Sequence, residues 1–182
     1  WSRRAGLAAA RCQALLQAKA AVIGAKRAAK EAGVDLPVLV NVTVETTGTM
    51  LLGSEIGAAL TTLQALGVDG IGLNCATGPA EMSEHLRHLS RNAQVGVACM
   101  PNAGLPELTA DGARYPLGPE EFTATLTQYV AEFGLGLVGG CCGTTPEHIR
   151  QLSDAVGGRP LAPRTQADVA SVSSLYADTP LR

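Results

Sequence analysis

Four short apolar segments, each followed by a stretch of helical periodicity, constrain most strongly how this chain of 182 residues can fold. They are rich in Val, Leu and Ile, which is typical of strands that a parallel sheet buries on both faces. Strands that alternate with helices along a chain predict a parallel α/β fold with right-handed crossovers. The expected strands cover residues 38–44, 70–75, 95–100 and 135–138.

Five helices are expected around these strands. Thr145 is a suitable N-cap for the last of them, because Pro146 follows it at the first helical position. Residues 1–10 show no clear period, and the small polar residues and prolines after Gly157 are typical of a linker or tail. We therefore expect one domain over residues 1–157 and a tail over 158–182. The expected helices cover residues 11–32, 54–67, 79–91, 119–133 and 146–156.

Four strands are too few to close a barrel of eight, which typically needs about 250 residues. An open sheet of four strands would leave two unpaired edges. The pattern is therefore compatible with a compact open sheet or with the second half of a (β/α)₈ barrel, and periodicity does not choose between them.

Composition excludes several classes of protein. The net charge is −2 and no Lys/Arg cluster occurs, so a nucleic-acid partner is not expected. No apolar run is long enough to span a membrane. Five cysteines, an odd number at irregular spacing, are typical of a cytoplasmic protein and not of a disulfide framework. The chain opens with Trp1, so we expect it to be a fragment of a longer protein.

Three cysteines lie where expected strands end. Cys75 ends one strand, and the adjacent Cys141 and Cys142 follow another at a glycine-rich turn into a helix. Carboxyl ends of parallel strands meet at one edge of a sheet, where α/β folds place their chemistry. Three thiolates there would form a site for a soft metal, and zinc is the metal that we expect first. Buried core cysteines or redox thiols are the alternatives that spacing alone leaves open.

Four loop motifs resemble those of the homocysteine S-methyltransferases, in particular the homocysteine-binding module of cobalamin-dependent methionine synthases. The pairing of Gly-x-Asn-Cys with a later Gly-Gly-Cys-Cys-Gly-Thr is highly specific to this family. A segment at residues 172–176 (VSSLY) also resembles the linker that leads to the folate-binding module of those synthases. The four motifs are ETTGTMLLG at 45–53, GLNCATGP at 72–79, MPNAGLP at 100–106 and GGCCGTTP at 139–146.

The resemblance implies a (β/α)₈ TIM barrel, of which this chain would supply strands five to eight. It implies zinc held by Cys75, Cys141 and Cys142, and a methyl group transferred to the sulfur of homocysteine to give methionine. Methylcobalamin would be the donor, bound like folate by a module outside this chain. The other barrel half and these modules would be its partners.

Two residues are candidates for substrate binding, and none is a candidate catalytic residue. Asn102 corresponds to an asparagine that contacts the homocysteine backbone, although beside Pro101 it could simply form a turn. Glu45 follows a strand end and could face the substrate's ammonium group, with a capping or solvated role as the alternative.

The beginning of the chain departs from the family. The resemblance places a Glu-Thr pair at the end of strand four, where its glutamate holds the substrate's amino group. The corresponding residue here is Ala10, followed by Arg11, and residues 1–12 do not resemble that strand. We therefore expect the chain to be inactive alone. A non-catalytic zinc-binding or half-barrel interaction module is the competing interpretation.

Overall fold

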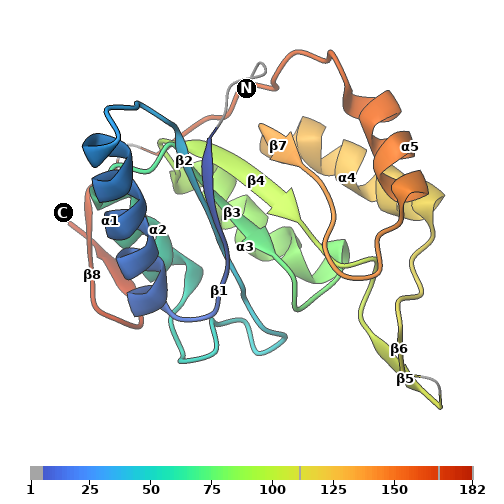
Figure 1. The fold of residues 1–182 in the computed structure, drawn as a ribbon. Helices are drawn as coiled ribbons and strands as arrows, with labels where there is room; N and C mark the ends of the chain where they lie inside the picture. The colour runs from blue at the N-terminus through green and yellow to red at the C-terminus, as the bar shows by residue number, and fades with distance from the viewer. Residues whose placement is uncertain (1–5, 111, 168, 182) are drawn as a thin grey trace.

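A five-stranded parallel sheet is the centre of the molecule (Figure 1). The computed structural model describes residues 6–110, 112–167 and 169–181. The strand order is β1-β2-β3-β4-β7, so each strand pairs with the preceding sheet strand along the chain. The strands are β1 (Leu7–Cys12), β2 (Val38–Val42), β3 (Gly70–Asn74), β4 (Gly96–Met100) and β7 (Leu137–Val138).

The helices pack beside one another in chain order, from α1 to α5. Proline occupies the start of α3, α4 and α5, and α5 begins with a reciprocal capping box between Thr145 and His148. The predicted bounds of α4 and α5 are confirmed. The helices are α1 (Leu15–Glu31), α2 (Ile56–Ala65), α3 (Pro79–Asn92), α4 (Pro119–Phe133) and α5 (Pro146–Val156).

The prediction of four strands is wrong, because β1 adds a fifth. It pairs in parallel with β2, and its register shifts between Ala9 and Cys12. Alanine-rich sequence has little β propensity, so no strand signal stands out there. Cys12, predicted to lie in a helix, is buried at the end of β1. Residues 1–5, part of the segment without a clear period, lie outside the described residues.

The two faces of the sheet differ in chemistry. Val40, Ile71 and Leu73 point to the face that the helices cover and belong to the core. Most of the alternate residues are small or polar, with Asn41 beside Gly72. A Cβ on Gly72 would overlap the Asn41 side chain and lie 2.7 Å from the Ala98 Cβ. Only glycine therefore fits this close packing on the second face.

The sequential winding positions the carboxyl ends of all five strands along one edge. A doubly wound sheet would reverse its order at a switch point, whereas this sheet does not. The architecture is an α/β fold consistent with part of a (β/α)₈ barrel.

The longest connection, after β4, forms a projecting arm. Its strands β5 (Glu107–Thr109) and β6 (Gly112–Arg114) pair antiparallel. The arm extends beyond the carboxyl edge of the sheet at the lower right of Figure 1. Leu108 on this arm is 94% exposed. These three-residue strands were not predicted.

The segment after α5, expected to be a linker or tail, runs back along the domain. The Arg164 guanidinium donates to the Val95 carbonyl, and Gln166 donates to that of Ala93. It ends in a hairpin of β8 (Ser171–Ser173) and β9 (Asp178–Pro180), which packs beside α2. Among the described residues, no helix has the length and apolarity needed to cross a membrane.

Candidate metal centre

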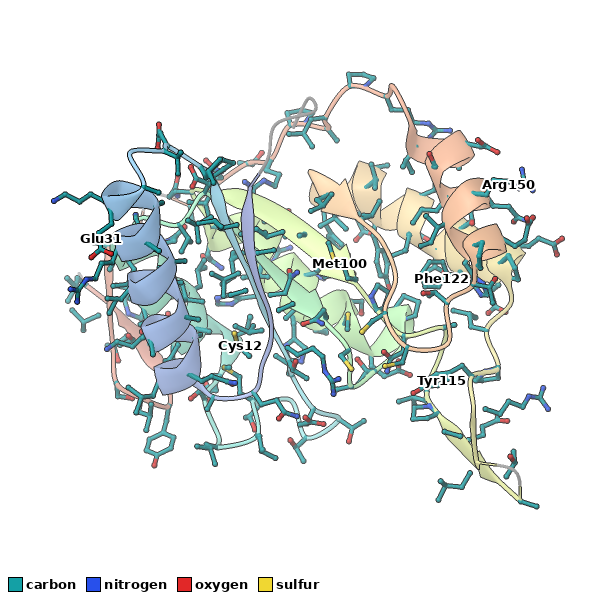
Figure 2. The ribbon with its side chains drawn as sticks, viewed as in Figure 1. Cys12, Glu31, Met100, Tyr115, Phe122 and Arg150 are labelled. Carbon is teal, nitrogen blue, oxygen red and sulfur yellow. The ribbon has the colours of Figure 1, made fainter. Side chains whose placement is uncertain are left out.

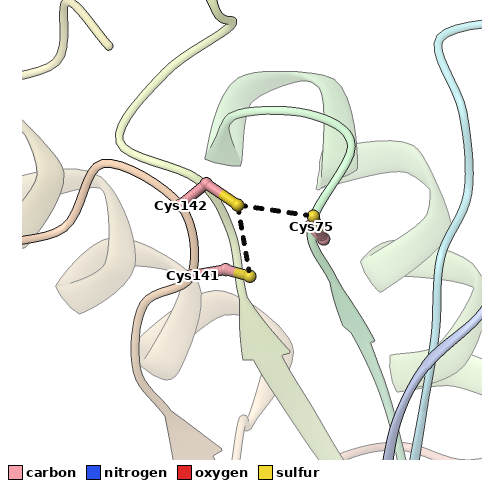
Figure 3. A group of neighbouring side chains, drawn as sticks. All are labelled: Cys75, Cys141 and Cys142. Carbon is pink, nitrogen blue, oxygen red and sulfur yellow. Dashed lines mark hydrogen bonds between the residues drawn. The ribbon is translucent and has the colours of Figure 1, made fainter. Parts of the chain in front are cut away.

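Three cysteine sulfurs meet at the carboxyl edge of the sheet (Figure 3). Cys142 Sγ lies 3.7 Å from Cys75 Sγ and 3.9 Å from Cys141 Sγ, and all three atoms lie within 4.8 Å of one another. Residues 67 positions apart in the chain are thus brought together by β3 and β7. The expected convergence of these thiols is confirmed, and all are free cysteines.

The spacing suits a tetrahedral metal. Zinc–sulfur bonds of about 2.3 Å at tetrahedral angles place neighbouring sulfurs about 3.8 Å apart. Two of the three sulfur pairs have this spacing. Three soft donors, with one coordination position left for a further ligand, fit zinc better than a hard cation such as Mg²⁺. The described His, Cys, Asp and Glu residues form no other group with this geometry.

Cys75 is aimed by an unusual backbone. Cys75 and Ala76 have φ of 64° and 60°, in the left-handed region of backbone conformation that residues other than glycine rarely adopt. The Cys75 N–H donates to the Met100 carbonyl at 3.2 Å, and Thr77 N–H donates to the Cys75 carbonyl at 2.7 Å. Backbone strain of this kind, held by its surroundings, is typical of functional sites.

Cys141 and Cys142 are held by backbone hydrogen bonds to the loop after β4. The Cys141 N–H donates to the Pro101 carbonyl at 2.8 Å, and Ala103 N–H donates to the Cys142 carbonyl at 2.9 Å. Gly143 follows with φ of 76°, which lets the chain turn away toward α5. The loops after β4 and β7 therefore form one unit.

Two buried asparagines support the cysteines. Asn102 accepts a hydrogen bond from the Cys142 N–H at 3.1 Å, so its amide oxygen orients the thiol loop. Asn74 accepts from the Arg11 N–H at 3.0 Å and directs its own amide toward Cys141 Sγ at 3.9 Å. Asn102 thus lies at the site as expected, and its role toward substrate stays a prediction. Asn74 lay within a recognised motif, yet its supporting role was missed.

The environment moves the two adjacent thiols in opposite directions. Burial raises the pKa of Cys141 to about 11, with further contributions from neighbouring Cys75 and Cys142. Burial would also raise the pKa of Cys142. Hydrogen bonds from Cys75, Tyr115 and Cys141, and the positive charge of Arg11, instead lower it. Cys142 is therefore the better prepared of the two to lose its proton.

His148, whose place in the first turn of α5 would suit a surface position as well as an approach to the site, is buried. It is 5% exposed and packs edge-on against Phe122. Its Nδ1 accepts from the Thr145 N–H, so Nε2 carries the proton and donates to the Leu117 carbonyl at 2.9 Å. His148 therefore joins α5 to the segment after the arm. Only its place in the first helical turn could have suggested this.

The remaining candidates lie away from the cluster or have no role assigned there. Glu45 is half-buried in the loop after β2, where its N–H donates to the Thr49 carbonyl; it is not part of the thiol group. Cys99 is fully buried in the core, and burial raises its pKa. Tyr115, which no local pattern singled out, lies beside the thiols.

The chain is similar in sequence to known proteins. Two proteins named methionine synthase, from Mycobacterium tuberculosis and Mycobacterium leprae, are 64% and 63% identical to the chain over 169 and 174 residues. Each match covers 93% of this chain and 14% of the relative. The chain therefore spans about one seventh of the length of these proteins.

The sequence profile described as homocysteine S-methyltransferase matches residues 5–156, which include β1 and all three clustered cysteines. The match ends with α5 and leaves the segment that forms β8 and β9 outside. By this match over most of its length, the chain belongs to the homocysteine S-methyltransferase family.

Proposed function

We propose that this chain forms the thiol-activating part of an enzyme that methylates homocysteine to methionine. Cys75, Cys141 and Cys142 would hold zinc, and homocysteine would be the methyl acceptor. The observation that carries the proposal is the meeting of three sulfurs within 4.8 Å at the carboxyl edge of the sheet. Family membership supports the choice of substrate.

Activation of a thiol is the chemical problem that such a site addresses. A free thiol has a pKa near 8.5, and only its thiolate is a good nucleophile. Zinc held by three thiolates would supply a fourth position at which the substrate sulfur binds deprotonated at neutral pH.

The surrounding residues would keep the ligands in place. Asn102 fixes the backbone of Cys142, and Asn74 faces the sulfur of Cys141. Such outer contacts orient metal ligands and tune their charge. Glu45 is the proposed partner of the substrate's ammonium group, and Asn102 would also contact the substrate backbone.

We further propose that the chain supplies strands four to eight of a (β/α)₈ barrel, with β1 as the fourth. The atoms Asn41 Oδ1 and Thr43 Oγ1 support this proposal, because both are buried without a hydrogen-bond partner among the described residues. They lie on the face opposite the helices, which the other half of a barrel would cover.

Other modules would complete the reaction. Methylcobalamin is the proposed methyl donor, held by a module that this chain does not contain. The segment at 158–182 would lead toward a folate-binding module. The chain's share of its relatives, 14% of their length, leaves ample room for such modules.

One observation favours the competing function, a non-catalytic zinc-binding or half-barrel interaction module. The end of β1 carries Ala10 and Arg11, where the resemblance places the glutamate that holds the substrate's amino group. No carboxylate is available at that position.

A methionine-formation assay with homocysteine and methylcobalamin tests the proposal. The 182-residue chain alone should be inactive. A version extended by the missing βα units and carrying Ala10→Glu should form methionine only when zinc is present. A folded, zinc-loaded extended version without activity would overturn the proposed reaction, whereas activity of the short chain would overturn the partial-barrel proposal.

A further inference from the structure

Four exposed leucines, here called the edge leucines, lie on loops at the carboxyl edge of the sheet. Two belong to the loop after β2 and two to the connection after β4 that forms the arm. The sheet order β2-β3-β4-β7 makes these two loops alternate with the loops after β3 and β7, which carry the clustered cysteines. Apolar side chains therefore flank the thiol cluster. The edge leucines are Leu51, Leu52, Leu105 and Leu108.

The loop after β2 turns two leucines outward. The Gly53 N–H donates to the Met50 carbonyl at 2.8 Å, which closes a tight turn with Leu51 and Leu52 at its corners. Met50 is buried in the core and anchors the turn, whereas the two leucines are 61% and 62% exposed. Residues at turn corners face water and are usually small or polar. Adjacent leucines at such corners favour a surface that another body covers.

The arm after β4 has no core of its own. All six residues of its strands β5 and β6 are exposed, and Leu108 is almost completely so. An isolated two-stranded hairpin is only marginally stable in water, because it buries little apolar surface. The arm would therefore gain stability from a partner that covers its tip, and it extends beyond the carboxyl edge (Figure 1).

Close packing fixes the arm relative to both cysteine loops. Gly104, before the arm, lies so near Gly78 of the Cys75 loop that a Cβ on Gly78 would be 2.9 Å from the Gly104 Cα. Tyr115, at the base of the arm in Figure 2, packs against Gly143, where a Cβ would overlap its ring. A body that contacts the tip of the arm is thereby held at a defined place relative to the three sulfurs.

This placement indicates which body would cover the edge leucines. A methyl group can pass to a sulfur only when its carbon lies about 3–3.5 Å from that sulfur. The proposed donor is held by another module, so that module has to rest on the carboxyl edge during transfer. The chain covers 14% of the relatives named methionine synthase, which leaves length for such a module. The other half of the barrel would instead pair with the open sides of β1 and β7.

We propose that the edge leucines form the surface on which the donor-bearing module of the same protein docks. The inference rests on the proposed function and adds the residues that receive this module. A contact through so few apolar side chains is small, which suits a complex that forms for the transfer and then separates.

The test uses the full-length enzyme that contains this chain and compares two donors. In the bound-donor assay, methylcobalamin held by the enzyme reacts with homocysteine in a single turnover, which the absorbance of the corrinoid follows. In the free-donor assay, methylcobalamin is added to the same enzyme after removal of its bound corrinoid. Only the bound-donor assay requires the module to dock.

Two variants place charge on the proposed surface. Leu108→Asp alters the arm, and a double variant, Leu51→Asp with Leu52→Asp, alters the turn. Each should slow the bound-donor assay about tenfold or more, as expected for a main contact, and change the free-donor assay less than about twofold. Thermal unfolding should be unchanged, because none of these leucines belongs to the core.

Leu161→Asp is the matched control. Leu161 is 63% exposed, and it lies near the amino-terminal ends of β4 and β7, at the opposite edge of the sheet. The same exchange of leucine for aspartate should therefore leave both assays unchanged.

An unchanged bound-donor assay in both variants would overturn the docking surface. Equal slowing of both assays would also overturn it, because the leucines would then act on the thiol site itself. An enzyme that is a dimer and becomes a monomer in Leu108→Asp would identify a second copy as the occupant. If the unaltered enzyme transfers no methyl group in either assay, the proposed function fails, and the donor-bearing module fails as occupant with it.

Discussion

The two sides of the metal centre are built differently. Cys75 directly follows β3, which pairs with β2 over four residues and with β4 over five. Cys141 and Cys142 follow β7, which pairs with β4 over two residues. The sheet therefore fixes the position of Cys75, whereas the loop after β4 fixes the positions of the other two.

This difference shows two ways to place a ligand at a strand end. On the β3 side the strand decides where Cys75 lies, and a strained left-handed turn aims its sulfur. On the β7 side the backbone is aimed by hydrogen bonds from outside the strand, through Pro101, Asn102 and Ala103. Away from the three ligands themselves, changes on the first side should mainly alter stability, and changes on the second should alter metal binding.

Removal of a ligand should have the largest effect on either side. Serine in place of Cys75, Cys141 or Cys142 removes one of three thiolates, so zinc should fall from about one ion per chain to almost none in each variant. Metal analysis after dialysis measures this. Cys99→Ala, which alters a buried cysteine outside the cluster, should keep its zinc. Retention of zinc in all three serine variants would show that these cysteines are not the zinc ligands.

The pH dependence of zinc binding should be the next largest effect, and it belongs to the β7 side. Burial and the neighbouring thiols raise the pKa of Cys141 to about 11, so this thiol is protonated at neutral pH. Zinc must displace that proton, and lower pH opposes the displacement. Affinity should therefore fall about tenfold per pH unit, for each proton released, as pH drops from 8 to 6. Competition titrations that show no pH dependence would contradict this expectation.

The two supporting asparagines come from different sides, Asn74 from the end of β3 and Asn102 from the loop after β4. Asn102→Ala leaves the Cys142 N–H without its acceptor, which should cost about 1–3 kcal/mol of unfolding free energy and weaken zinc binding about 10- to 100-fold. Asn74→Ala loses a longer contact of 3.9 Å to Cys141 Sγ and should weaken binding less. Denaturant unfolding and zinc competition measure both. A larger loss of zinc affinity in Asn74→Ala would reverse the ranking.

Relief of strain on the β3 side should have the smallest effect. A left-handed residue other than glycine costs about 1–2 kcal/mol, and glycine's greater freedom in the unfolded chain offsets roughly half of that gain. Ala76→Gly should thus raise the unfolding free energy by up to about 1 kcal/mol, with zinc affinity little changed. In the matched control, Ala59→Gly inside α2, the same exchange should lower stability by about 1 kcal/mol.

The sequence predicts best those helices and strands whose ends are marked by particular residues. Proline at the first helical position gave α4 and α5 their bounds, and strands ending in cysteine gave the three thiols their common edge. Their joint placement follows from parallel pairing alone, which explains why the cluster was accessible from sequence.

Features that depend on tertiary partners were not predictable in this way. Strand β1 is alanine-rich and exists through its pairing with β2. The positions of Tyr115 and His148 depend on how the proline-rich connection after β4 folds back. Tyr115 packs against Gly143, and His148 bonds to Leu117, only in the folded chain. No local period reports such contacts.

The fixed course of the segment after α5 limits how far an attached domain could move. A free linker of about 24 residues would spread over roughly 27 Å and let an attached body sample a wide volume. Here Arg164 and Gln166 bind the amino-terminal edge of β4, and the hairpin β8–β9 packs beside α2. A body joined beyond residue 181 would therefore be tethered at β9, a defined point of departure. Its effective concentration at the thiol edge would be set by the chain that follows β9 and not by the segment that follows α5.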